Sequence, residues 1–250
     1  MKKLAKVLSL VMALVLCLAL FSACGAEKDG EKEKLVMGTN AAFPPYEYYD
    51  GDEIVGIDAE IAALIAEKLD MELEITDMDF NGIISAVQNG VVDIGLAGMT
   101  VTDKRLESVN FSDTYAVGVQ VVIVKEGSDI KKIEDLEGKL IGVQEATTGD
   151  IYSTDEFGEE NIKRYQTGAA AVAALQGGIV DAVIIDNEPA KAFVKENKGL
   201  TILEAHYADE EYAIAVAKDN TELLEKINTA LAELKADGSI DKIVNKYIPS

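Results

Sequence analysis

The 250-residue sequence has no tryptophan, a single histidine, His206, and only two cysteines, Cys17 and Cys24. One histidine leaves no histidine cluster for zinc and argues against a Ser-His-Asp or Cys-His triad. Cys17 lies inside an apolar run and Cys24 closes that run, so no disulfide framework is available to the mature chain. The sequence therefore predicts neither a metal site nor a cofactor.

Positive charge is also scarce, because 23 lysines and arginines face 45 aspartates and glutamates, giving a formal net charge of −22. Nucleic-acid binding needs clustered basic side chains, so this balance argues against a nucleic-acid partner. Only Arg105 and Arg164 are arginines. With 48% hydrophobic residues, the chain can bury the core of one large domain or two small ones.

The first 24 residues have the three-part order of a secretory signal. Three lysines precede an almost wholly apolar run over 7–21, and Ser22-Ala23-Cys24-Gly25 follows. The alternative is an N-terminal membrane helix, which the short apolar run disfavours. The small-small-Cys-Gly end resembles the bacterial lipobox, with Phe21 where leucine is more usual. That resemblance implies a lipoprotein signal peptide over 1–23 and a lipid, such as palmitate, on Cys24.

Residues 24–34 are predicted to form a charged, solvated tether, because they contain almost no apolar side chains. The folded part is expected to begin at Leu35. From there, short apolar strands alternate with amphipathic helices, a pattern typical of α/β folds with mainly parallel sheets flanked by helices. The strands are expected at 35–39, 71–75, 92–96, 119–124, 139–144, 180–185 and 210–218.

Helices are expected to follow many of these strands, beginning at polar residues that can cap them. The candidate caps are Asp58, Asn81 and Thr221, and a short helix is expected over 129–136. Ligands of such folds gather at the carboxyl ends of the strands. Asn40, Phe80 and the turn over 98–105 each follow a predicted strand, so we expect them to converge.

The turn between Gly98 and Arg105 is suited to binding a carboxylate. Gly98 lets a ligand approach the backbone, and the arginine guanidinium offers a planar, two-pronged donor. In the second half of the chain, 145–150 opens a helix whose free N–H groups suit an anion. Asp186 ends a buried strand, where it can either receive an ammonium group or cap the next helix.

A known family accounts for these features together. Eight motifs, in this order, carry the resemblance: L-V-M-G-T-N-A-A-F-P-P-Y-E-Y (35–48), V-G-I-D-A-E-I (55–61), D-F-N-G-I-I-S-A-V-Q (79–88), D-I-G-L-A-G-M-T-V-T-D-K-R (93–105), F-S-D-T-Y (111–115), G-V-Q-E-A-T-T-G-D (142–150), D-A-V-I-I-D (181–186) and A-D-G-S-I-D-K-I (236–243). The chain from 35 to 248 resembles the substrate-binding proteins of bacterial polar amino-acid ABC importers, solute-binding protein family 3, which have the type II periplasmic-binding fold.

The resemblance implies two lobes, each a mainly parallel sheet flanked by helices, joined by a hinge of two strands. Lobe 1 would comprise 35–117 with 211–250, and lobe 2 would comprise 118–210. Such a protein is expected to be a monomer outside the cytoplasm, anchored to the cell membrane through Cys24. It would capture an amino acid between its lobes and deliver it to a membrane permease.

The resemblance also implies the roles of eleven ligand-binding residues. Arg105 would bind the ligand carboxylate with the Thr100 and Thr148 N–H groups, and Asp186, the Gly98 carbonyl and the Thr100 hydroxyl would hold the ammonium group. Phe43 and Phe80 would flank the ligand side chain, and Asn40 and Gln144 would touch its tip. Met99 and Thr147 complete the set, with packing and helix capping as their respective alternatives. Ala146 stands where the family often has glycine.

The ligand identity is inferred from the predicted tip residues. Asn40 and Gln144 carry no charge there, which favours a neutral polar amino acid such as glutamine. A basic amino acid is the alternative, because Glu145 or Glu47 can reach in. Two other functions remain open: a dehydratase-type enzyme on the same scaffold, with Asp186 or Glu145 as acid or base, and a sensor that signals through a partner.

Overall fold

The computed structural model describes residues 32–249. The predicted signal peptide and Cys24, together with most of the predicted tether, lie outside these residues. Within the described part of the chain, none of the helices has the length and apolar character needed to cross a membrane.

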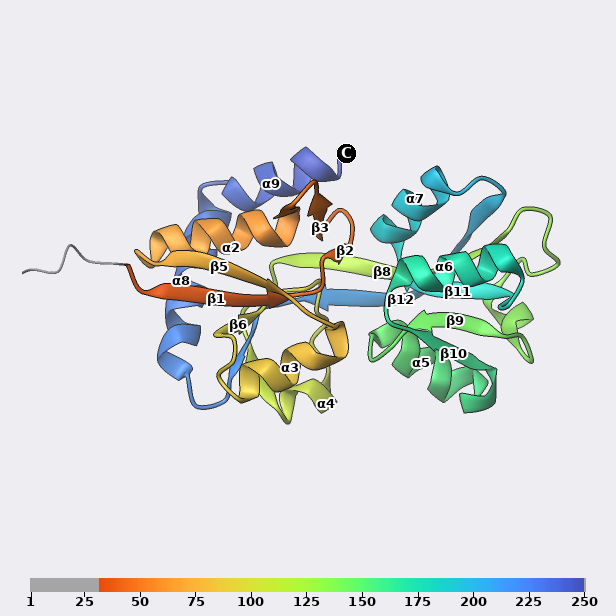
Figure 1. Ribbon diagram of the computed structural model, residues 1–250, viewed down its shortest axis with the longest axis horizontal. Coiled ribbons are helices and arrows are strands. Elements are labelled where there is room, and N and C mark those ends of the chain that lie inside the picture. Colours follow the sequence, from red (N-terminus) through yellow and green to blue (C-terminus); the bar gives the residue numbers. More distant parts are fainter. Residues whose placement is uncertain (1–31, 250) are drawn as a thin grey trace, which may run out of the picture. The chain divides into compact units, whose positions relative to one another are not determined.

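The first lobe is built on a mixed five-stranded sheet (Figure 1). Its strand order is β5 (Glu72–Asp77), β1 (Lys34–Thr39), β6 (Ile94–Gly95), β13 (Ala215–Ala217) and β7 (Val109–Phe111). β1 pairs in parallel with β5 and β6, whereas β13 runs antiparallel to β6 and β7. A small antiparallel sheet is formed by β2 (Ala42–Phe43), β3 (Glu47–Asp50) and β4 (Glu53–Val55).

Helices cover both faces of this sheet because its strand side chains alternate between two hydrophobic clusters. Leu35 and Met37 point into one cluster and Val36 into the other, as the two-residue period of a strand requires. The first cluster lies under α2 (Ile57–Lys68), α8 (Thr221–Ala236) and α9 (Ser239–Tyr247). The second lies under α3 (Phe80–Gln88), which is followed in the chain by the short α4 (Asp103–Leu106).

The second lobe repeats this arrangement with a second five-stranded sheet. Its strand order is β10 (Ile162–Tyr165), β9 (Ile141–Gln144), β11 (Ala182–Asp186), β8 (Ala116–Lys125) and β12 (Leu200–Tyr212). The helices α6 (Gly168–Gly177) and α7 (Asn187–Glu196) pack on one face. The other face carries α5 (Thr148–Phe157) and the short 3-10 helices η1 (Ile133–Leu136) and η2 (Glu159–Asn161).

Two long strands, β8 and β12, connect the lobes (Figure 1). They are antiparallel, and their pairing extends from Ala116 and Tyr212 at one end to Lys125 and Leu200 at the other, with register shifts between Ile202 and Ala208. Tyr212 forms a further bridge to Thr100 in the first lobe. The two lobes are therefore joined by a paired ribbon at the hinge.

The predicted alternation of strands and helices is confirmed, but the predicted caps are wrong. α2 begins after Gly56, and the Asp58 carboxylate instead accepts hydrogen bonds from Gly98 and Tyr115. α3 begins after Asp79, so Asn81 lies within that helix. Thr221 is the first residue of α8, which is capped by the side chain of Asn220. A polar residue within two positions of a helix start satisfies the same local pattern, so the sequence did not separate these neighbours.

Candidate functional site

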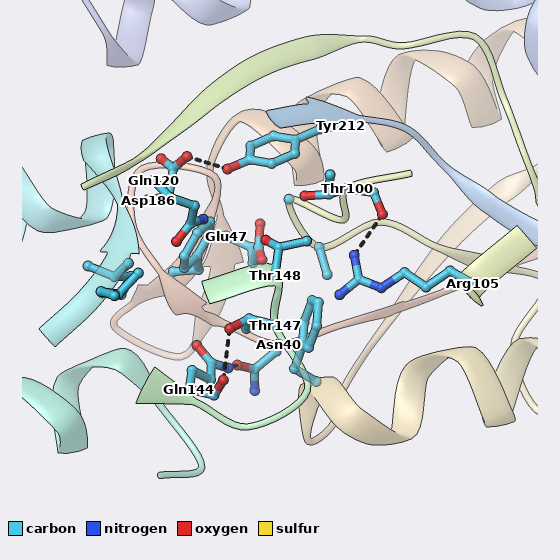
Figure 2. A pocket seen from close by; sticks show the side chains of 16 residues that line it. Asn40, Glu47, Thr100, Arg105, Gln120, Gln144, Thr147, Thr148, Asp186 and Tyr212 are labelled. Carbon is cyan, nitrogen blue, oxygen red and sulfur yellow. Dashed lines mark hydrogen bonds between the residues drawn. The ribbon is translucent and has the colours of Figure 1, made fainter. Parts of the chain in front are cut away.

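A pocket lies between the two lobes, at the carboxyl ends of β1, β9 and β11 (Figure 2). It is lined by Asn40, Phe43, Glu47, Phe80, Ala97, Gly98, Thr100, Arg105, Gln120, Gln144, Thr147, Thr148, Ile184, Ile185, Asp186 and Tyr212. Asn40, Ala97, Gly98, Thr100 and Thr147 lie in loops that follow strands, and the other lining residues lie in strands and helices. The polar groups come from both lobes and from the hinge strands.

Arg105 provides the positive charge of the pocket. Its guanidinium donates through Nη1 to the Thr100 carbonyl at 2.6 Å and through Nη2 to the Ala146 carbonyl at 3.0 Å. It also lies 5.4 Å from the centre of the Phe80 ring. Burial lowers the pKa of Arg105 to about 10, so the side chain stays charged at neutral pH. The contact with Ala146 links the first lobe to the second.

Two threonine hydroxyls, one from each lobe, share a buried carboxylate beside this arginine. Thr148 Oγ1 donates to Glu210 Oε2 at 3.0 Å, and Thr100 Oγ1 donates to the same oxygen. Because each hydroxyl uses its proton on Glu210, its oxygen still has lone pairs for another donor. Thr148 is also the first residue of α5, so its N–H group has no partner within the helix.

Asp186 provides a negative charge on the other side of the pocket. Its Oδ2 accepts from Tyr212 Oη at 2.5 Å and from the Val119 N–H at 3.1 Å, and its Oδ1 accepts from the Glu188 N–H at 3.1 Å. Asp186 is therefore both the N-cap of α7 and a pocket residue. The capping role is confirmed, and the binding of an ammonium group stays a prediction. Burial raises its pKa to about 6, against the opposing effect of these hydrogen bonds.

A glycine makes room for this carboxylate. A Cβ atom on Gly118 would lie 2.4 Å from Asp186 Oδ2 and 2.5 Å from Tyr212 Oη. No larger residue fits there without displacing one of the two groups. Gly118 on β8 thus lets a hinge tyrosine reach the Asp186 carboxylate of the second lobe.

The tip positions named from the sequence meet each other across the pocket. Gln144 Nε2 donates to Asn40 Oδ1 at 2.9 Å, and both side chains are labelled in Figure 2. Asn40 Nδ2 also donates to the Met78 carbonyl at 2.9 Å. Phe43 packs against the bare backbone of Gly98, where a Cβ atom would lie 2.9 Å from the ring. Gly98 has a φ of 51°, a backbone conformation that favours glycine.

Ten of the eleven residues predicted from the sequence line this pocket, and Met99 does not. The Met99 side chain is fully buried in the hydrophobic cluster under α3, so its assignment as a ligand residue is corrected to packing. Thr147 lines the pocket and also caps α5, because its Oγ1 accepts from the Asp150 N–H at 3.3 Å. Glu145 does not line the pocket and instead accepts a hydrogen bond from Asn81.

Sequence analysis did not place several other residues in the pocket: Ala97, Gln120, Ile184, Ile185 and Tyr212. Glu47 had been considered only as a possible partner of a basic ligand. Gln120 and Tyr212 lie on the hinge strands, which enter the site only when both lobes are assembled. Ile184 and Ile185 belong to a run of buried aliphatic residues that looks like ordinary strand core.

Two α/β lobes, a hinge of paired strands and a pocket with an arginine and an aspartate on opposite walls define a solute-binding protein. The sequence model of a protein family, the bacterial extracellular solute-binding proteins, family 3, matches residues 35–250. The chain belongs to that family, which confirms the resemblance inferred from the sequence. The proteins of this family are solute-binding components of transporters and not enzymes.

Individual relatives agree with this assignment. The chain is 36% identical to the arginine-binding extracellular protein ArtP of Bacillus subtilis (strain 168), over 97% of each chain. Solved structures of an ancestral arginine-binding protein, bound to glutamine and bound to arginine, share 42% identity with TM-scores of 0.83 and 0.82. Each covers 88% of this chain and 100% of the ancestral chain. These neighbours have the two-lobed type II periplasmic-binding fold, which confirms the predicted fold class.

Proposed function

We propose that this protein captures a polar amino acid between its lobes and delivers it to the permease of an ABC importer. The observation that carries the proposal is that Arg105 and Asp186 belong to different lobes and line the same pocket. For the lobe boundaries we propose 35–117 with 211–250 for lobe 1, and 118–210 for lobe 2.

A free amino acid is a zwitterion, and both of its charged ends lose water when the lobes close over it. Each end must regain partners, or the desolvation penalty prevents binding. In our proposal, Arg105 binds the carboxylate with the Thr100 and Thr148 N–H groups. Asp186 binds the ammonium group, with the Gly98 carbonyl and the Thr100 hydroxyl oxygen. Phe43 and Phe80 then enclose the ligand side chain, and Asn40 and Gln144 face its tip.

Closure of the lobes would follow from contacts that only the closed form makes. Apart from bonds made by the hinge strands, three hydrogen bonds already cross between the lobes: Arg105 to Ala146, Gln144 to Asn40, and Asn81 to Glu145. A ligand that touches both lobes adds to these contacts, so it binds the closed form more tightly than an open one. The permease would then recognise the closed lobes.

Two amino acids are the leading candidates for the ligand. The uncharged amide pair Asn40 and Gln144 fits the terminal amide of glutamine, which is our first choice. Arginine is the second choice, since relatives of 36% and 42% identity are named for arginine. One of these relatives has been solved with either amino acid bound, which supports testing both.

Calorimetric titration with the twenty amino acids tests the proposal. We expect at least one to bind with a dissociation constant of about 1 μM or less, equivalent to about −8 kcal/mol. Arg105→Ala should abolish that binding, because the ligand carboxylate then loses its charged partner. Lys104→Ala, which removes an exposed neighbouring cation, is the matched control and should bind as the wild type does. The proposal would be contradicted if none of the twenty amino acids binds, or if Arg105→Ala binds the ligand as tightly as the wild type does.

The location of the protein is proposed from its first residues and its family. We propose that the signal peptide over 1–23 is removed, and that Cys24 carries lipid and anchors a monomeric protein to the outer face of the cell membrane. Mass spectrometry of the mature N-terminus tests this, because Cys24→Ser should yield an unlipidated chain. The dehydratase alternative predicts turnover of the bound ligand, whereas our proposal predicts that the ligand is recovered unchanged.

A further inference from the structure

Two acidic side chains lie buried behind the pocket on the first lobe. Glu47 is the first residue of β3, is 1% exposed and lines the pocket. Asp58 is the second residue of α2 and is completely buried. The proposed function gives this pair no role in binding either the carboxylate or the ammonium group of the ligand.

The two carboxyl groups differ in their hydrogen-bond partners. Asp58 Oδ2 accepts from the Gly98 N–H at 2.7 Å and from Tyr115 Oη at 2.8 Å. Asp58 Oδ1 and both oxygens of Glu47 have no donor from any other described residue. The backbone brings the two residues together, because the Asp58 N–H donates to the carbonyl of Tyr46, the residue before Glu47, at 2.9 Å. Ionised carboxylates only accept, so a hydrogen bond between the two carboxyl groups requires a proton on one of them.

No charge from the surroundings compensates the pair. Among residues 32–249, no ion pair includes Glu47 or Asp58. The titratable groups that interact electrostatically with the pair are Tyr46, just before β3, Tyr115, just before β8, and Asp186, at the end of β11. All of them are neutral or negative, so two ionised carboxylates in this place would repel each other without relief.

The partners also indicate which group holds the proton. Asp58 already receives two hydrogen bonds that favour its ionised form, whereas Glu47 receives none from other residues. Burial raises the pKa of Glu47 well above its usual range, and the neighbouring Asp58 carboxylate adds to this effect. Burial raises the pKa of Asp58 only to about 7, because Gly98 and Tyr115 oppose the shift.

We propose that Glu47 and Asp58 share one proton, with Glu47 as the neutral donor and Asp58 as the carboxylate that fixes the turn at Gly98. Glu47 is then a positioning residue, which holds Asp58 against the Gly98 N–H and Tyr115. In the proposed binding function, the ammonium end of the ligand therefore meets one charged group, Asp186. Glu47 does not act as a counter-ion that selects a cationic side chain.

The pH dependence of stability tests the shared proton without any ligand. The pKa of glutamate in an unfolded chain is about 4.3, so above that pH unfolding releases the proton that the native pair holds. Native protein then binds more protons than unfolded protein, and stability falls as pH rises from about 5 to 8. Glu47→Gln keeps the donor to Asp58 but has no proton to release. Its unfolding free energy should therefore depend less steeply on pH, by an amount that corresponds to about one proton.

Control variants separate the titration of Glu47 from the titration of other acidic residues. Glu53→Gln changes an exposed glutamate on β4 and should leave the slope as in the wild type. A slope in Glu47→Gln equal to that of Glu53→Gln would overturn the proposal. If Glu47→Gln does not fold, infrared spectroscopy of the wild type with isotopically labelled glutamate decides the matter. A protonated glutamate carboxyl at pH 7 supports the proposal, and its absence overturns it.

Ligand binding gives a second readout. Glu47→Gln should bind the amino acid found in the calorimetric panel within about threefold of the wild type, whereas Glu47→Ala should lose about tenfold or more, because Asp58 loses its donor. Equal affinities of the two variants would contradict the positioning role. The stability slope and the infrared signal do not depend on a ligand, so failure of this inference is distinguishable from failure of the proposed function.

Discussion

Arg105 and Asp186 differ in how far their pKa values lie from neutral pH. Burial lowers the pKa of Arg105 to about 10 and raises that of Asp186 to about 6. Arg105 therefore keeps its charge in moderate acid, whereas Asp186 becomes protonated and loses its charge. A protonated Asp186 no longer attracts the ammonium group of the proposed ligand.

Ligand affinity should consequently fall as pH decreases through about 6. We expect the loss to approach tenfold per pH unit well below that value, because each ligand bound then displaces one proton from Asp186. Asp186→Asn should bind weakly at all pH values and lose this dependence. Calorimetry between pH 5 and 8 measures both effects, and a wild-type affinity that stays constant down to pH 5 would contradict the role of Asp186.

Other buried acids show why single residues are difficult to assign from sequence. Asp58 stands at the start of a helical pattern, so capping was a natural prediction for it. Its true partners, Gly98 and Tyr115, are 40 and 57 residues away in the chain. Glu210 likewise connects Thr100 and Thr148 only because its strand passes between the lobes. Such contacts depend on tertiary structure and leave no local signal.

At the scale of elements, the start of α5 combines a helix cap with a strained turn. Ala146 has a φ of 63°, which is uncommon for a residue with a Cβ atom, and its carbonyl accepts from Arg105. Its N–H donates to Asp150 Oδ2 at 3.0 Å, which holds the turn against the first turn of the helix. The family resemblance implies that glycine is common at this position, and the φ of Ala146 lies in a region that favours glycine.

Ala146→Gly should raise the free energy of unfolding by about 0.5–1 kcal/mol. Relief of the left-handed strain contributes about 1–2 kcal/mol, and the greater freedom of glycine in the unfolded chain offsets part of it. Ala173→Gly, in the exposed middle of α6, should instead lower stability by about 1 kcal/mol. Denaturant unfolding of both variants measures these changes. A destabilised Ala146→Gly would show that the alanine methyl group, rather than strain, dominates at this turn.

The strands and helices themselves were largely predictable, because alternating and helical hydrophobic periods are local. The strand predicted over 35–39 corresponds to β1. The strand predicted over 180–185 corresponds to β11, which begins two residues later and ends one residue later. The strand over 92–96 was overestimated, since only Ile94 and Gly95 pair, as β6. The short helix predicted over 129–136 is reduced to η1, because residues 129–132 are not helical. The sheets are mixed rather than mainly parallel where β8, β12 and β13 join them.

At the scale of the whole described unit, the pocket exists because two separate cores are connected by paired strands. Each sheet has its own hydrophobic clusters on its two faces. Asn40, Phe80 and the turn over 98–105 follow strands of one lobe, so their convergence could be predicted from strand positions. That Asp186 of the other lobe joins them was implied only by the family resemblance. The contributions of Gln120 and Tyr212 could not be predicted, because they depend on how the hinge strands pass between the lobes.

The central claim is that one amino acid is held by a cation from one lobe and an anion from the other. The most direct measurement is the crystal structure of the protein grown with the amino acid that binds most tightly in the calorimetric panel. The account predicts the ligand carboxylate on the Arg105 guanidinium and its ammonium group within hydrogen-bond distance of Asp186. A ligand bound elsewhere, or one in this pocket that touches neither side chain, would contradict it.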